Sequence, residues 1–142
     1  MLEKMTSAIE RQAKILYVDE AIFSPVTMLK WTWSLPNDNV KVTDLRKKVK
    51  TQAIVAGIST DKGLESFLIK ERSIKNKEFI EFLKQLRELY PNDTLVLFLD
   101  NLSVHKSREV TAVYAEQNLE TVFCVPYSPQ YNGIESYWFL IK

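Results

Sequence analysis

The sequence contains few of the residues that build common metal and nucleotide sites. Among its 142 residues there is one cysteine, Cys124, and one histidine, His105. With so few cysteines and histidines the chain cannot form a Cys/His zinc cluster, a disulfide framework or a CxxC redox motif. Glycine occurs three times, so neither a glycine-rich dinucleotide fingerprint nor a P-loop can be assembled. A metal ion bound to this chain must therefore have mainly oxygen ligands.

Long apolar runs and a large net charge are missing as well. The longest apolar stretches, such as Leu95 to Leu99, are far shorter than the roughly 20 residues of a membrane helix. The N-terminus mixes both charge signs and lacks the apolar region of a secretory signal. We therefore expect an intracellular protein of the nucleus or the bacterial cytoplasm, without membrane contact. The 19 Lys and Arg against 18 Asp and Glu give no global support for DNA binding, but a local basic patch is compatible with it.

The order of apolar patterns predicts a mixed sheet flanked by helices. A helical pattern over residues 1–14 leads into the first strand, and 46% hydrophobic residues suffice for one core in the remaining chain. Strands are followed by alternating helices and strands, which is the element order of the RNase H-like fold. The predicted strands are Ile15–Asp19, Thr27–Trp33, Thr51–Ser59, a fourth in LESFLIKE, Thr94–Asp100 and TVFCV. The predicted later helices end at Tyr90-Pro91, span about 106–118, and begin at Asn132.

Two aspartates, Asp19 and Asp100, end apolar strands that are neighbours in an RNase H-like sheet. Each is also a common turn former, so either one alone is weak evidence for a site. Two adjacent carboxylates raise each other's pKa unless a cation neutralises them. Hard oxygen ligands favour Mg²⁺ or Mn²⁺.

Glu135 lies at the start of the last predicted helix. Asn132 is a good N-cap, which places Gly133 at the first helical position and Glu135 at the third, as in a capping box. A helix N-terminus also keeps a carboxylate ionised, as a metal ligand must be. A capping role and a metal-binding role for Glu135 predict the same backbone. They differ in whether Asp19 and Asp100 lie within reach of Glu135.

Three segments carry a family resemblance: YVDEAIFS, FLDNLSVHKS and VPYSPQYNGIESYW, in this order. From about Ile15 onward the chain resembles the catalytic domain of mariner-like DDE transposases, which include related bacterial insertion-sequence transposases. The 34 residues between Asp100 and Glu135 match the spacing of that superfamily. The resemblance implies an RNase H-like catalytic domain over residues 15–142, short at its C-terminus, after a lead-in helix or linker over residues 1–14.

By this resemblance Asp19, Asp100 and Glu135 are the catalytic triad. They would bind two Mg²⁺ or Mn²⁺ ions for hydrolysis of a DNA phosphodiester and for strand transfer. Asp100→Asn is then expected to abolish cleavage and to preserve or raise the melting temperature, because it relieves carboxylate repulsion.

Other residues match the family's segments in supporting roles. Asn101 and His105 match its Asp-Asn…His segment and orient a ligand or the scissile strand; the alternatives are a helix N-cap and an exposed histidine. Tyr127 and Asn132 match the approach to the last helix and set the turn that presents Glu135. The family usually has proline where this chain has Gly133, which loosens that turn.

A basic run is the best candidate for phosphate contact, since the resembling transposases carry a DNA-contacting insertion at this place. A solvated loop is the alternative. The residues are Lys41, Arg46, Lys47, Lys48 and Lys50.

The resemblance implies DNA as partner, both transposon ends and target. Full-length transposases of this type carry helix-turn-helix modules, and none fits into the 14 residues before the first strand. A second copy of the chain, or a protein that supplies the DNA-binding domain, is therefore also expected. The alternative is a domesticated, non-catalytic subunit that binds protein or nucleic acid in a larger assembly.

Overall fold

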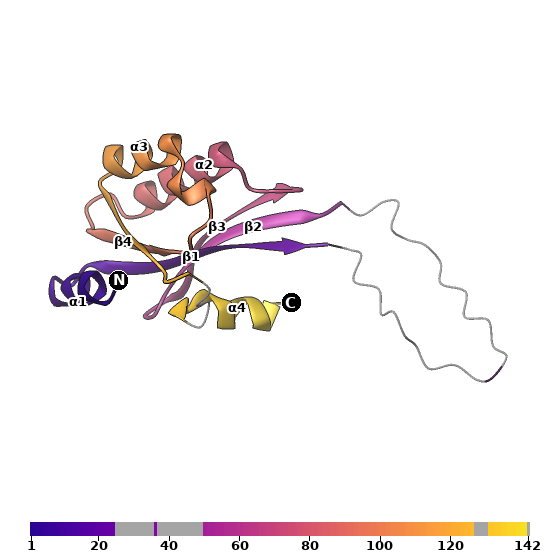
Figure 1. Ribbon diagram of the computed structural model, residues 1–142, viewed down its shortest axis with the longest axis horizontal. Helices are drawn as coiled ribbons and strands as arrows, with labels where there is room; N and C mark the ends of the chain where they lie inside the picture. The colour runs from indigo at the N-terminus through magenta and orange to yellow at the C-terminus, as the bar shows by residue number, and fades with distance from the viewer. Residues whose placement is uncertain (25–35, 37–49, 127–130, 142) are drawn as a thin grey trace.

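A five-stranded mixed sheet forms the centre of the computed structural model (Figure 1). Its order is β3-β2-β1-β4-β5; β2 is antiparallel to β1 and β3, whereas β4 is parallel to β1 and β5. This is the RNase H-like arrangement, and the predicted fold class is confirmed. The strands are β1 (Lys14–Phe23), β2 (Gln52–Ser59), β3 (Gly63–Glu71), β4 (Leu95–Leu99) and β5 (Leu119–Phe123).

The structure describes residues 1–24, 36, 50–126 and 131–141. The predicted strand Thr27–Trp33 and Tyr127 lie outside these ranges, as do four of the basic residues, Lys41, Arg46, Lys47 and Lys48. In the described ranges no helix is long and apolar enough to cross a membrane.

Helices cover both faces of the sheet (Figure 1). On one face lie α2 (Asn76–Leu89) and α3 (Arg108–Glu116), the latter after a short 3-10 turn, η2 (Val104–Lys106). On the other lie α1 (Leu2–Glu10) and α4 (Ile134–Ile141). The helices form where apolar residues recur at helical spacing, as in α2, which buries Phe79, Phe82, Leu83 and Leu86.

The first strand is longer than predicted and extends past Asp19 to Phe23. It continues because β2 offers an antiparallel partner over this length, from Tyr17 opposite Ile58 to Phe23 opposite Gln52. Asp19 therefore lies within a strand and does not end it. Adjacent side chains alternate between the two faces of the sheet, so Asp19 and Glu20 point to opposite sides.

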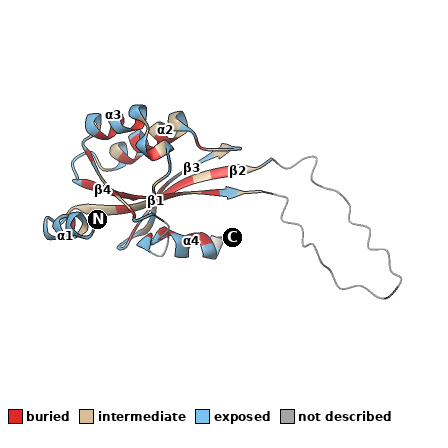
Figure 2. Ribbon diagram, viewed as in Figure 1, coloured by how far each residue is buried: buried red, intermediate tan, exposed pale blue. Residues whose placement is uncertain are grey.

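Strand β4 is buried at all five positions, as expected of a parallel strand that is covered on both faces (Figure 2). The cluster around α2 and α3 includes Leu16, Leu97 and Leu99, whereas Phe98 faces α1 on the other side. The C-terminal end of β4 is thereby held rigidly, which fixes where Asp100 emerges.

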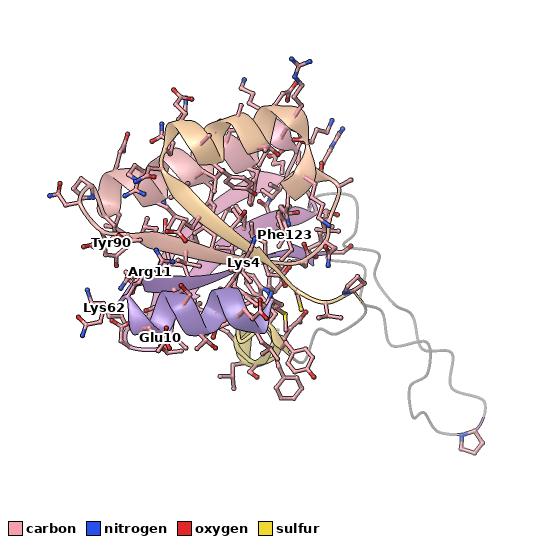
Figure 3. All side chains as sticks on the ribbon, turned by 60° about the vertical axis from the view of Figure 1, so that its left-hand side comes forward. Lys4, Glu10, Arg11, Lys62, Tyr90 and Phe123 are labelled. Atoms are coloured by element: carbon pink, nitrogen blue, oxygen red, sulfur yellow. The ribbon has the colours of Figure 1, made fainter. Side chains whose placement is uncertain are left out.

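The N-terminal end of β1 is fixed by a cluster of polar side chains. Lys14 Nζ lies 2.7 Å from Glu65 Oε1, and the Tyr90 hydroxyl donates a hydrogen bond to Glu65. The Lys14 ammonium also lies 4.7 Å from the centroid of the Tyr90 ring. Figure 3 shows Lys62 and Tyr90 at this end of the molecule, away from Phe123 at the end of β5.

Candidate active site

The strand register places Asp19 and Asp100 at the same level of the sheet. The last aligned pair of β1 and β4 is Tyr17 with Phe98. Asp19 follows two residues after Tyr17 within β1, and Asp100 follows two residues after Phe98, just past the end of β4. β4 ends at Leu99, so the edge of β1 at Asp19 is no longer paired with it. The two carboxylates therefore lie where adjacent parallel strands cease to pair.

Asp19 is a buried carboxylate with 9% of its surface exposed. Burial, together with the smaller effect of the negative charges of Glu135 and Asp100, raises its pKa to about 6. Hydrogen bonds from the Glu20 backbone and from the Trp138 indole act in the opposite direction. Trp138 Nε1 donates to Asp19 Oδ2 at 3.0 Å. The three acids of the predicted triad thus share one electrostatic environment.

Asp100 has a positive partner, which the sequence interpretation did not foresee. Its Oδ1 lies 2.8 Å from His105 Nδ1 and accepts a hydrogen bond from the Leu102 backbone at 3.1 Å. Burial alone would raise the pKa of Asp100, but the contacts with His105 and Leu102 outweigh it and lower the pKa. Relief of carboxylate repulsion, the reason given for a preserved or raised melting temperature in Asp100→Asn, does not apply to a carboxylate that faces His105. Because the substitution removes the counter-charge of His105, a lower melting temperature is now expected.

His105 is fully buried, so the alternative of an exposed histidine is wrong. Its Nε2 lies 3.3 Å from Glu20 Oε1, and its ring stacks on Phe79 with centroids 4.6 Å apart. Burial disfavours the charged imidazolium, but Asp100 and Glu20 outweigh this and raise the pKa of His105 to about 9. Nδ1 makes no directed hydrogen bond to any described residue, so its link to Asp100 is an ion pair.

Asn101 connects the end of β4 to β5. Its Nδ2 donates to the Cys124 backbone carbonyl, and its Oδ1 accepts from Lys106 Nζ. It is not the N-cap of α3, the alternative considered above, because Ser107 accepts that bond from the Val110 backbone at 3.3 Å. Asn101 therefore holds the loop that follows Asp100.

Helix α4 begins at Ile134, one residue later than predicted. Asn132 is 5% exposed and its Oδ1 accepts from the Ile134 backbone at 3.4 Å, so it stabilises the helix start as expected. Glu135 is exposed in the first turn, and its backbone donates to the Asn132 carbonyl at 3.2 Å. The Glu135 carboxylate is therefore near the N-terminus of α4, where the helix dipole stabilises a negative charge.

The three acids of the predicted triad offer the oxygen ligands that a hard divalent cation prefers. Asp19, Asp100 and Glu135 supply oxygen only, and Glu135 and Asp100 add to the effect of burial in raising the pKa of Asp19. Within the described ranges, no group of three or more Asp, Glu, His or Cys side chains is close enough together to hold one ion. The acids are therefore neighbours that have not converged on a single point.

Comparison of the sequence with known protein families identifies the family of this chain. The profile of the family described as DDE superfamily endonuclease matches residues 14–142. The chain belongs to this family. None of the curated proteins compared with this DDE endonuclease matches it.

Solved structures share the fold of this DDE endonuclease at 16% sequence identity. The Mos1 strand transfer complex matches with a TM-score of 0.69 over 98% of this chain and 44% of that chain. The Mos1 mariner transposase catalytic domain matches with a TM-score of 0.66 over 98% and 64%. An intasome of simian T-cell lymphotropic virus, in complex with a PP2A regulatory subunit, matches with 0.64 over 90% and 37%. The chain thus spans less than half of the first of these.

Sequence reasoning missed three residues at the candidate site: Glu20, Lys106 and Trp138. Glu20 was visible as a charged residue on the apolar, inward-facing side of β1, which calls for a buried partner. Trp138 follows Glu135 by one helical turn, a spacing that places both on one face. The fifth basic residue predicted to contact DNA, Lys50, forms an ion pair of 2.9 Å with Glu71.

Replacing Gly133 with alanine is expected to stabilise the fold by about 0.5–1 kcal/mol, since it restricts the unfolded chain. A Cβ at this position would meet the Tyr17 ring at 3.6 Å, an ordinary contact. Urea denaturation of Gly133→Ala and of the wild type measures the difference. A loss of stability would mean that the turn before α4 needs glycine.

Stability is expected to fall as the pH rises through 9. The pKa of His105 is about 9 in the fold, above its ordinary value of 6.5, so folding favours the charged form. This contribution, on the order of 3 kcal/mol, is complete below pH 6.5 and disappears above pH 9. The charged groups that face the imidazole are Asp100 and Glu20, whereas the Tyr114 hydroxyl donates to the backbone carbonyl of His105 at 3.1 Å. Urea denaturation at about pH 6 and pH 9.5 measures the change, and a pH-independent difference from His105→Phe would contradict it.

Proposed function

We propose that this chain is the catalytic core of a DNA transposase or integrase-type endonuclease that performs metal-dependent phosphodiester hydrolysis and strand transfer. One observation carries the proposal: the pairing of β1 with β4 brings Asp19 and Asp100 to the same level of the sheet. The charge of Glu135 also acts on Asp19, whose pKa is raised to about 6, mainly by burial. Membership of the DDE superfamily endonucleases supports the same chemistry.

Asp19, Asp100 and Glu135 would hold the two Mg²⁺ or Mn²⁺ ions. The Mos1 catalytic domain has been solved with Mg and with Mn, which supports this choice of metal. Such ions activate the attacking oxygen and stabilise the leaving oxygen of an in-line displacement.

The chain's own residues prepare this site. His105 holds one oxygen of Asp100 by an ion pair, which leaves the other for a ligand. Asn101 and Lys106 fix the loop after β4, and the Lys106 ammonium lies 5.0 Å from the centroid of the Phe123 ring. Glu135 is exposed, and its negative charge acts on Asp19 from the first turn of α4.

DNA is the proposed substrate, as transposon ends and target. The matched Mos1 chains include a strand transfer complex and a paired-end complex with a transposon end. We further propose that Lys41, Arg46, Lys47, Lys48 and Lys50 contact the DNA backbone, with Tyr127 and Asn132 shaping the approach to Glu135. A second copy, or a protein that supplies a DNA-binding domain, would complete the assembly.

A Mn²⁺ titration followed by melting temperature tests the metal site. Saturable stabilisation is expected for the wild type and a smaller effect for Glu135→Gln, whose exposed side chain can change without unfolding the protein. Glu116→Gln, an exposed change at the end of α3, is the matched control and should behave as the wild type. Nicking of a supercoiled plasmid in Mn²⁺ should follow the same order. Equal metal responses in all three proteins, without nicking, would overturn the proposal.

The second candidate function is a non-catalytic subunit that binds protein or nucleic acid. It is favoured by the finding that no three potential ligands converge within the described part of the chain. The two functions predict different results in the titration. Binding of DNA without metal stabilisation or nicking would favour the subunit.

A further inference from the structure

Trp138 joins helix α4 to strand β1. It lies three residues after Glu135 and is 4% exposed, with its ring against Phe23 at a centroid distance of 6.4 Å. Its indole Nε1 donates to Asp19 Oδ2 at 3.0 Å. Residues three apart on a helix are neighbours on its surface. One helix face therefore carries both Glu135 and the group that binds Asp19.

We propose that Trp138 is a positioning residue whose indole N–H fixes α4 against β1, so that Glu135 is held beside Asp19. This inference rests on the proposed function, because it assigns Glu135 and Asp19 to one metal site. The other donor to Asp19 is the Glu20 backbone, which belongs to β1 itself and cannot attach the helix. Among the described residues, Trp138 is the hydrogen-bonding link from α4 to a predicted ligand.

The hydrogen bond between Trp138 and Asp19 fixes α4 in one position along β1, which apolar packing alone does not do. Ile134 and Trp138 form a buried apolar cluster with Ala21 and Ala56, and Phe23 is among the larger apolar residues that pack against it. Apolar contacts have no preferred direction. Phe139 and Leu140 on the outside of α4 are 84% and 81% exposed. A charge-assisted hydrogen bond is directional and strong where water is excluded, so it sets the position of the helix along β1.

Trp138→Phe tests the proposal, since it keeps an aromatic ring in the cluster and removes the donor together with part of the indole volume. Mn²⁺ affinity, measured by electron paramagnetic resonance, should fall about tenfold or more, as for other residues that orient metal ligands. Tyr137→Phe is the matched control on the same helix and should bind as the wild type does.

A double-mutant cycle with Glu135→Gln separates positioning from general structural support. If Trp138 places Glu135, the loss of Mn²⁺ affinity caused by Glu135→Gln should shrink severalfold in the Trp138→Phe background. Additive losses would overturn the proposal.

Amide hydrogen exchange gives a second readout that needs no metal. In Trp138→Phe the amides of α4 should lose protection while those of β4 keep theirs. Unchanged protection in α4 would overturn the inference. If the wild type binds no Mn²⁺, the proposed function fails, and the exchange result alone then decides the role of Trp138.

Discussion

Replacing Asp19 with asparagine is expected to raise the free energy of unfolding at pH 7 and to abolish DNA cleavage. The pKa of Asp19 is about 6 in the fold, above its ordinary value of 3.8, so its ionisation opposes folding above about pH 4. Asparagine carries no charge and keeps an oxygen for the Trp138 N–H. The expected gain is on the order of 2 kcal/mol, and urea denaturation measures it.

The same experiment at about pH 4 is the control for Asp19→Asn. There the wild-type carboxyl is protonated in the fold, so the gain in stability should largely disappear. A variant that is equally less stable than the wild type at both pH values would show that Asp19 stabilises the fold. A variant that still nicks plasmid DNA in Mn²⁺ would remove Asp19 from the catalytic site.

Replacing His105 with phenylalanine is expected to destabilise the protein by about 3 kcal/mol, the low end for a broken buried ion pair, because Asp100 keeps solvent contact. The substitution keeps an aromatic ring beside Phe79 but leaves the carboxylates of Glu20 and Asp100 without their shared cation. Cleavage should fall as well, since Asp100 loses the group that orients it. Urea denaturation and plasmid nicking measure the two effects.

Glu20→Gln in the His105→Phe background provides the control. With one of the two carboxylates neutral, the double variant should be more stable than His105→Phe alone. A His105→Phe variant as stable as the wild type would show that the ion pairs contribute nothing, and the assignment of a charged imidazole would be wrong.

Much of the fold was accessible from the sequence because its elements follow strong periodic signals. The helix ending at Leu89 and the buried strand at Leu95–Leu99 were predicted from apolar spacing alone. The adjacency of β1 and β4, which brings Asp19 to the level of Asp100, followed from element order and the RNase H-like topology. The boundary of β1 was missed, because only the pairing with β2 carries this strand past Asp19.

The electrostatics of the site could not be predicted in the same way. A carboxylate next to other carboxylates suggested that both aspartates would have raised pKa values, but this holds for Asp19 and not for Asp100. The difference comes from His105, which is buried by the turn after β4 and by Phe79 of α2. The contacts of His105 with Phe79 and Glu20 join segments far apart in sequence, and no local pattern shows that its ring is turned toward the nearby Asp100.

The pairing of β1 with β4 has a consequence for the order of folding. The β2–β3 hairpin and its pairing with β1 join segments that are closer in the chain than Lys14 and its partner Leu95. Because long loops close more slowly, we expect β1, β2 and β3 to associate before β1 pairs with β4. Asp19 and Asp100 then meet only in the last stage, so a partly folded or newly synthesised chain would lack the proposed site.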